Sequence, residues 1–228
     1  MKFWKGISQD RLLIDLSLWS ANLANLGEEV QRTEALVDGY HFDVSDAHFV
    51  PGLLFFPDLI AALRPLTARP FHVHLMVERP DTLVQPFVEA GADLITVHVE
   101  NGPACAAAIE LIRKAGKSAG IALSVETAPH TAIPYLDAIE AITLMGTPLG
   151  IKGQGLAPEA AARIQATRQI LRAHGDRSPV ILLADGGIRQ HTAALLRQAG
   201  ADGIVPGSLY FGSPNPAETI HWLHSLPR

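Results

Sequence analysis

Short apolar runs alternate with amphipathic stretches along the chain, and this alternation limits the possible folds more than any single residue does. Eight runs rich in Val, Ile and Leu are the predicted strands: 12–16, 40–44, 71–76, 94–99, 120–125, 141–145, 180–184 and 203–205. Five stretches place apolar residues three and four positions apart, as a helix does: 58–66, 80–90, 102–115, 158–173 and 192–199. The strand-and-helix unit recurs about every 27 residues.

Three of the predicted helices end at a glycine suited to a left-handed cap, namely Gly91, Gly116 and Gly200. Eight such units in 228 residues, with strands that are apolar on both faces, predict a single (β/α)8 TIM barrel over residues 1–228. An open, doubly wound parallel sheet remains the alternative fold. We expect the residues up to Asp10 to form an N-terminal cap and the tail after Phe211 to form a closing helix.

Charge and hydropathy exclude several classes of partner. The chain has 18 basic and 23 acidic residues and no basic patch, which argues against nucleic acid as a partner. Polar residues and prolines interrupt every apolar run before the roughly 20 residues that a membrane span needs. The start of the chain lacks the apolar core of a signal peptide, so we expect a cytoplasmic protein that does not contact a membrane. The single cysteine, Cys105, excludes a disulfide or a Cys-based zinc site within one chain.

Polar residues at the carboxyl ends of the predicted strands require an explanation, because barrel enzymes place their chemistry there. They are Ser17, Ser20, His41, Asp43, His72, His74, His98, Glu100 and Asp185. His41 and Asp43 share a face of one strand, as do His72 and His74, because residues two apart point the same way. A divalent metal ion would satisfy such buried groups, and this donor set suits Zn²⁺, Fe²⁺, Mn²⁺ or Co²⁺. Alternatively, His72 and His98 are hydrogen-bonded core residues and Asp185 fixes a turn.

Two small-residue pairs follow the seventh and eighth predicted strands. Gly186-Gly187 and Gly207-Ser208 stand where (β/α)8 enzymes often bind a phosphate through bare backbone N–H groups. For either pair alone an ordinary tight turn is the better interpretation, and the two pairs together support a turn and a phosphate site about equally.

Several of these motifs resemble one known family. Residues 41–51, His-Phe-Asp-Val-Ser-Asp-Ala-His-Phe-Val-Pro, are similar to the His-x-Asp-Val-Met-Asp-Gly-His-Phe-Val-Pro signature of ribulose-phosphate 3-epimerases. Other segments resemble the family in the same order along the chain, from about Leu13 to Gly212: Ser17-Leu18-Trp19-Ser20-Ala21, His74-Leu75-Met76, Asp185-Gly186-Gly187 and Gly207-Ser208.

The resemblance implies a metal-dependent 3-epimerase of a phosphorylated ketose, by default one that converts D-ribulose 5-phosphate to D-xylulose 5-phosphate. One divalent ion would be held by His41, Asp43, His74 and Asp185, and would stabilise an enediolate as a Lewis acid. Asp43 and Asp185 would also move the proton, one on each face of the sugar carbon. Ser17 and His74 would contact the sugar, and Gly186, Gly187, Gly207 and Ser208 the phosphate. The family resemblance also implies a homo-oligomer.

The loop after the sixth predicted strand departs from the family. The family typically has the lid sequence Met-Ser-Val-Asn-Pro-Gly-Phe-Gly-Gly-Gln at this place. Residues 145–154 of this chain are Met-Gly-Thr-Pro-Leu-Gly-Ile-Lys-Gly-Gln. Gly150 and Gly153 are retained as expected phosphate contacts. Lys152 introduces a cation over the phosphate pocket, or else is a solvated lysine on a mobile loop. Because the departures cluster around the substrate, another ketose phosphate such as allulose 6-phosphate remains an alternative.

Three other classes of protein could use the same fold. Decarboxylases and aldol synthases that resemble orotidine-phosphate decarboxylase need an Asp-x-Lys-x-x-Asp motif, and no such lysine stands at these strand ends. A metal-dependent hydrolase would share the His and Asp ligands but would not need two opposed acids. A non-catalytic barrel that binds sugar phosphates would need neither the metal nor the two carboxylates.

Overall fold

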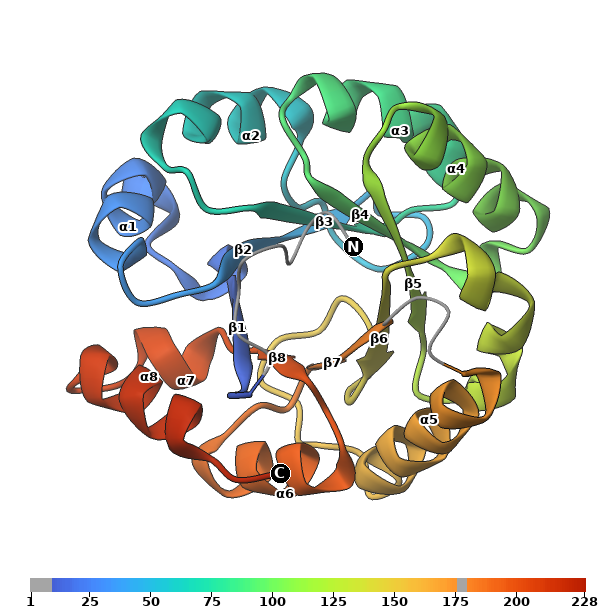
Figure 1. The fold of residues 1–228 in the computed structure, drawn as a ribbon. Coiled ribbons are helices and arrows are strands. Elements are labelled where there is room, and N and C mark those ends of the chain that lie inside the picture. Colours follow the sequence, from blue (N-terminus) through green and yellow to red (C-terminus); the bar gives the residue numbers. More distant parts are fainter. Residues whose placement is uncertain (1–9, 176–179) are drawn as a thin grey trace.

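Eight parallel strands close into a barrel in the computed structural model, which describes residues 10–175 and 180–228. Each strand pairs with the next along the chain, and β8 pairs with β1 (Figure 1). The strands are β1 (Leu13–Ser17), β2 (Gly39–Ser45), β3 (Phe71–Met76), β4 (Leu94–His98), β5 (Ser118–Leu123), β6 (Ala141–Met145), β7 (Ile181–Asp185) and β8 (Gly203–Val205). The TIM barrel is therefore confirmed and the doubly wound sheet is wrong, because an open sheet has two unpaired edges. The N-terminal cap predicted up to Asp10 falls almost entirely on residues outside the described ranges.

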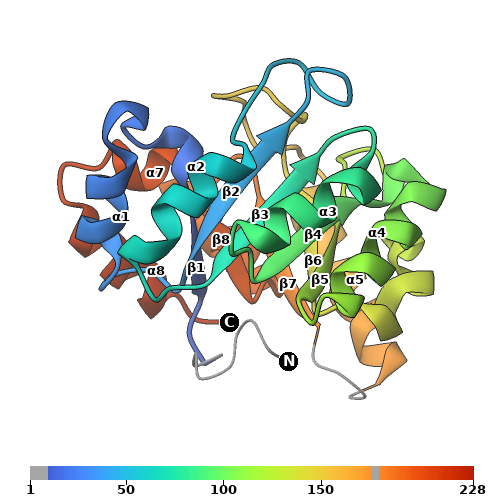
Figure 2. The same cartoon turned by 90° about the horizontal axis from the view of Figure 1, so that it is seen from above.

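Helices surround the barrel and bury the outer faces of its strands (Figures 1 and 2). They are α1 (Leu26–Thr33), α2 (Pro57–Leu63), α3 (Pro80–Glu89), α4 (Pro103–Lys114), α5 (Ala160–His174), α6 (Gln190–Ala199), α7 (Ser208–Phe211) and α8 (Pro216–Ser225). Short 3-10 segments are η1 (Leu18–Ser20), η2 (Leu23–Asn25), η3 (Arg64–Leu66), η4 (Val99–Asn101) and η5 (Pro129–Ala138). The closing helix expected after Phe211 is α8. Among the described residues, no helix is both long enough and apolar enough to span a membrane.

Proline and glycine explain where the outer ring departs from a regular helix and where its helices end. The segment between β5 and β6 is the 3-10 helix η5, which contains Pro129 and Pro134. Pro134 lies inside this segment and cannot donate a backbone hydrogen bond there, whereas Pro129 stands at its first position, where proline is tolerated. At the end of α6, Gly200 adopts φ 113°, so its predicted left-handed cap is confirmed.

The barrel interior is apolar at one end and polar at the other. Five side chains form a separate apolar cluster at its amino-terminal end: Leu13, Leu94, Ala141, Ile181 and Leu183. Above this cluster, strand register places Asp43 beside His74 and Ser17 beside His41. The loop between β2 and α2 and the loop after β6 project together beyond the polar, carboxyl end of the barrel (Figure 2). The fold thus directs the polar side chains toward the carboxyl ends of the strands, below these loops.

Candidate active site

Four side chains from three strands converge at the carboxyl end of the barrel. His41 and Asp43 come from β2, His74 from β3 and Asp185 from the last position of β7. Each offers one ligand atom, and these four atoms lie within 4.8 Å of one another. His41 Nε2 lies 3.4 Å from Asp43 Oδ1 and 3.6 Å from Asp185 Oδ2. The cluster predicted as metal ligands is therefore assembled in one place, although its four residues are spread over 145 positions of the chain.

The cluster fits a divalent metal ion. His41 Nε2, His74 Nδ1 and Asp185 Oδ2 are buried, and none has a hydrogen-bond partner among the described residues. Such orphaned polar atoms are costly unless something else satisfies them. His74 Nδ1 lies 3.6 Å from Asp43 Oδ1 and 3.7 Å from Asp185 Oδ2. Ligands at tetrahedral corners around a zinc-sized ion would be separated by roughly 3.4 Å, so the spacing suits coordination better than hydrogen bonding.

A second layer of polar residues lies behind the two histidines of the cluster. Asp15 Oδ2 lies 3.0 Å from His41 Nδ1 and 2.6 Å from His72 Nδ1. On the other side, His74 Nε2 lies 2.9 Å from His98 Nε2. His72 and His98 are thus hydrogen-bonded core residues. Asp15 was missed at the sequence level, and its signal was a single carboxylate inside the apolar run of the first strand.

The His98 ring is in turn held by Glu100, which follows β4. Glu100 Oε2 lies 3.0 Å from His98 Nδ1, and Oε1 accepts hydrogen bonds from Ser124 N and the Thr127 hydroxyl. Although burial raises the pKa of Glu100, the hydrogen bonds from His98 and Thr127 lower it to about 2. An ionised Glu100 therefore stands behind His98, one residue removed from the metal cluster.

The two aspartates of the cluster have opposite proton affinities. Burial raises the pKa of Asp185 to about 7; the charge of His41 opposes this shift, and the negative charges of Asp43 and Asp15 add to it. Burial also acts to raise the pKa of Asp43, but the charge of His41 and the adjacent imidazole of His74 hold that pKa below its usual range. One carboxyl group is thus suited to be the acid and the other the base.

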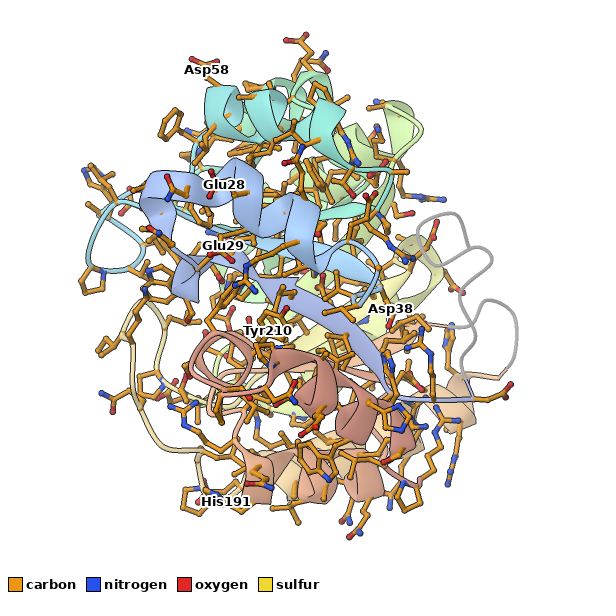
Figure 3. All side chains as sticks on the ribbon, turned by 90° about the vertical axis from the view of Figure 1, so that its left-hand side faces the viewer. Glu28, Glu29, Asp38, Asp58, His191 and Tyr210 are labelled. Atoms are coloured by element: carbon orange, nitrogen blue, oxygen red, sulfur yellow. The ribbon has the colours of Figure 1, made fainter. Side chains whose placement is uncertain are left out.

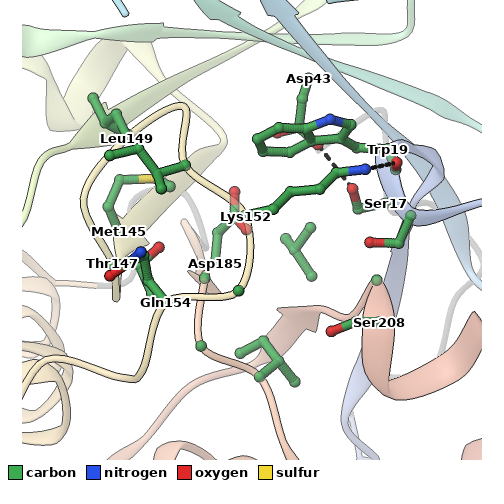
Figure 4. Close-up of a pocket in the computed structure, with 18 of the residues that line it drawn as sticks. Ser17, Trp19, Asp43, Met145, Thr147, Leu149, Lys152, Gln154, Asp185 and Ser208 are labelled. Carbon is green, nitrogen blue, oxygen red and sulfur yellow. Dashed lines mark hydrogen bonds between the residues drawn. The ribbon is translucent and has the colours of Figure 1, made fainter. Parts of the chain in front are cut away.

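A cavity lies above the cluster, and both aspartates face into it (Figure 4). Nearly all the predicted substrate contacts line it: Ser17, Gly150, Lys152, Gly153, Gly186, Gly187, Gly207 and Ser208. His74, also predicted to contact substrate, is buried below the cavity and is absent from its lining. Ser17 Oγ donates a hydrogen bond of 2.8 Å to Asp43 Oδ2. The cavity therefore brings the proposed acid–base pair and both small-residue pairs to one chamber.

One glycine from each small-residue pair lies so close to neighbouring atoms that a Cβ atom there would collide with them. Gly187 has φ 68°, and a Cβ atom there would lie 2.8 Å from Leu156 Cα. A Cβ atom at Gly207 would lie 2.7 Å from Ser20 Oγ. At Gly187 only glycine fits, because φ is positive and the neighbouring atoms are backbone, whereas a side chain at Gly207 would have to displace the Ser20 hydroxyl. Both glycines therefore present bare backbone to the cavity.

The loop after β6 reaches over the cavity through Lys152. Lys152 Nζ donates a hydrogen bond of 2.5 Å to the Trp19 carbonyl oxygen and lies 4.9 Å from the Trp19 ring centroid (Figure 4). Arg189 also lines the cavity, and its guanidinium donates a hydrogen bond of 3.1 Å to Ser208 Oγ. Trp19 and Arg189 were not predicted as site residues. Arg189 follows the predicted Asp-Gly-Gly segment by two residues, and that position was its sequence signal.

These features define a (β/α)8 barrel with a candidate metal site at its mouth, and comparison with known sequences identifies the family. The profile of the Ribulose-phosphate 3 epimerase family matches residues 13–211. The chain belongs to this family.

Individual relatives match nearly end to end. The chain is 37% identical over 224 residues to a ribulose-phosphate 3-epimerase of Synechocystis, covering 95% of both sequences. It is 39% identical over 214 residues to ribulose-phosphate 3-epimerase 2 of Cupriavidus necator, covering 91% of this chain and 88% of the relative. The corresponding enzyme of Bacillus subtilis is 34% identical over 209 residues, with 90% and 94% covered.

Comparison with solved structures shows a likeness of the fold alone. A 3-hexulose-6-phosphate synthase superposes with a TM-score of 0.68 at 17% identity, over 96% of this chain and 100% of that one. An orotidine 5'-phosphate decarboxylase from Pyrococcus horikoshii superposes with a TM-score of 0.65 at 16% identity, over 93% and 97%. At such identities the likeness says nothing of activity.

Proposed function

We propose that this chain is an isomerase that inverts C3 of a phosphorylated ketose, with D-ribulose 5-phosphate and D-xylulose 5-phosphate as the substrate pair. The observation that carries the proposal is the pair Asp43 and Asp185, which share one cluster, face one cavity and have pKa values shifted in opposite directions. Inversion needs a base on one face of the carbon and an acid on the other. A metal-dependent hydrolase would not need two such groups on opposite faces of one carbon.

The two aspartates divide the proton transfer between them. Asp43, ionised, removes the C3 proton of one epimer, and the C–H electron pair becomes the double bond of an enediolate. Asp185, protonated, returns a proton to the opposite face of C3 and is left ionised. The reverse reaction exchanges the roles. One divalent ion, held by His41, Asp43, His74 and Asp185, would supply Lewis-acid stabilisation for the negative charge that develops on the substrate oxygens.

The remaining residues of the cavity would bind and orient the substrate. Ser17, hydrogen-bonded to Asp43, is placed to contact the sugar. The backbone of Gly186, Gly187, Gly207 and Ser208 would receive the phosphate, with Gly150 and Gly153 closing over it from the loop. The cations Lys152 and Arg189 would add charge complementarity to a dianionic phosphate. His74 would act from below the cavity, as a metal ligand. We further propose, from the family resemblance, that the protein is cytoplasmic and forms a homo-oligomer. Light scattering after size-exclusion chromatography would test the homo-oligomer.

Lys152→Ala should raise KM for a phosphorylated ketose by about tenfold while changing kcat little, because an ion pair to phosphate forms in the ground and transition states alike. Steady-state kinetics with D-ribulose 5-phosphate measures this effect. The matched control is Lys114→Ala, since Lys114 is an exposed lysine paired with Glu110 on α4, outside the cavity lining. An unchanged KM would mean that Lys152 is a solvated lysine on the loop and does not bind the phosphate.

The proposed function is tested by incubating the protein with a panel of phosphorylated ketoses in D₂O, with and without a chelator. We expect deuterium at C3 and formation of the C3 epimer, both lost on chelation. D-ribulose 5-phosphate and allulose 6-phosphate are compared in the same experiment, which decides between the two substrates. If phosphorylated ketoses raise the melting temperature but no deuterium enters C3, the protein is a non-catalytic sugar-phosphate-binding barrel and the proposal fails.

A further inference from the structure

A buried carboxylate in the barrel interior touches neither the cavity nor the proposed substrate. Asp15, on β1, has no exposed surface, and neither have His41 and His72. One oxygen of Asp15, Oδ2, faces the Nδ1 atoms of both histidines, at 3.0 and 2.6 Å. A fully buried charge of this kind is costly unless its partners are well placed. Three apolar residues would avoid this cost, so the buried charge indicates a role other than core packing.

The hydrogen bonds determine which nitrogen of each ring carries a proton. An ionised carboxylate only accepts hydrogen bonds, so Nδ1 of His41 must be the donor to Asp15. The lone pair of the neutral His41 ring is then on Nε2, the atom that faces Asp43 and Asp185. The opposite tautomer would turn an N–H bond toward the metal site. Asp15 thus prepares His41 as a ligand without touching the ion.

His72 holds Asp15 in place from the other side. Its Nδ1 donates to Asp15 Oδ2, and its Nε2 lies 2.7 Å from Thr96 Oγ1, which can donate in return. The His41 and His72 rings pack edge to face, with centroids 4.5 Å apart. Asp15 therefore has little freedom to rotate away from His41.

We propose that Asp15 is a positioning residue for the metal site, which fixes the tautomer and orientation of His41, and that His72 and Thr96 hold Asp15 for this task. The proposal rests on the proposed function only in that both assign a metal ion to the same cluster. Carboxylates that orient histidine ligands typically change metal affinity or activity by about 10- to 100-fold when they are removed.

The experiment measures metal binding directly, by competition between the protein and a chromophoric chelator for Zn²⁺ or Co²⁺. Asp15→Asn should weaken binding by about 10- to 100-fold and alter the visible spectrum of the Co²⁺ form. The matched control is Asp38→Asn, because Asp38 is another buried carboxylate, which accepts a hydrogen bond from Ile14 N in β1. Asp38 directly precedes β2, at the amino-terminal end of the barrel and away from the metal cluster (labelled in Figure 3). We expect its metal affinity to equal that of the wild type. Metal-free melting temperatures report any loss of folding separately.

A relocated carboxylate separates positioning from simple core packing. His72 Nδ1 lies 3.2 Å from His41 Nδ1, so a carboxylate oxygen of an aspartate at position 72 would reach the same proton. The double variant Asp15→Ser, His72→Asp should therefore bind metal at least fivefold more tightly than Asp15→Ser alone. Wild-type affinity in Asp15→Asn, or no recovery in the double variant, would overturn the inference. If the wild type binds metal but does not epimerise ketose phosphates, the proposed function fails while this inference stands.

Discussion

Asp185→Asn and Asp43→Asn should each lower kcat for epimerisation by a factor of about 10² to 10⁴, the range contributed by a positioned acid or base. An amide cannot accept or release the C3 proton, yet it keeps the size of the carboxyl group and one oxygen that can still face the cluster. Neither residue lies in the turns proposed to hold the phosphate, so KM should change far less than kcat. The measurement is steady-state conversion of D-ribulose 5-phosphate, with bound metal quantified in each variant.

Isotope exchange distinguishes loss of a proton carrier from loss of the metal. With Asp185 replaced, Asp43 can still remove and return the proton on its own face, so deuterium should enter one epimer without inversion. With Asp43 replaced, exchange should appear in the other epimer. A variant that has merely lost its metal ion should exchange neither. The control, Asp58→Asn, changes an exposed carboxylate on α2 and should behave as the wild type (Figure 3). Near-full activity in either site variant would end its assignment as a proton carrier.

The barrel was predictable from the sequence because its strands are apolar on both faces. Every residue of β3 and β6 is buried, and both strands occur at the predicted bounds. Where a polar residue begins a strand, the prediction shifted: β5 begins at Ser118, two residues before the predicted start, and the Ser118 hydroxyl donates to Glu140. Hydropathy alone cannot show that such a residue belongs to the ladder.

The metal cluster was predictable for a different reason. His41 and Asp43 lie two apart on one strand, and barrel topology brings the ends of other strands to the same place. Asp15 was not predictable, because its role depends on the register that sets His41 and His72 on either side of it. Arg189 likewise became visible only when the loops after β7 and β8 were seen to meet, where its guanidinium reaches Ser208. Position along the chain marks Asp15 and Arg189 as candidates, but only the contacts between strands and between loops show what each residue does.

Removal of the metal ion should abolish epimerisation and also destabilise the fold. At a free metal concentration a hundredfold above Kd, binding contributes about 2.7 kcal/mol, which corresponds to a rise in melting temperature of roughly 5 to 10 °C for a chain of this size. Thermal melts with and without a chelator measure it. Equal melting temperatures at pH 8 would mean that the cluster holds no ion.

The gap between these two melting temperatures should widen as pH rises from about 5 to 8. The folded-state pKa of Asp185 in the metal-free protein is raised to about 7, above its unfolded value. The stability that the protonated carboxyl contributes is therefore complete below the unfolded pKa near 4 and is lost as pH rises through 7. Metal binding has the opposite dependence on pH, because a bound cation favours the ionised form of the Asp185 carboxyl over the protonated form. In Asp185→Asn neither effect can occur, so the gap in that variant should lose most of its dependence on pH. A gap that changes equally with pH in wild type and variant would assign the linked proton to another group of the cluster.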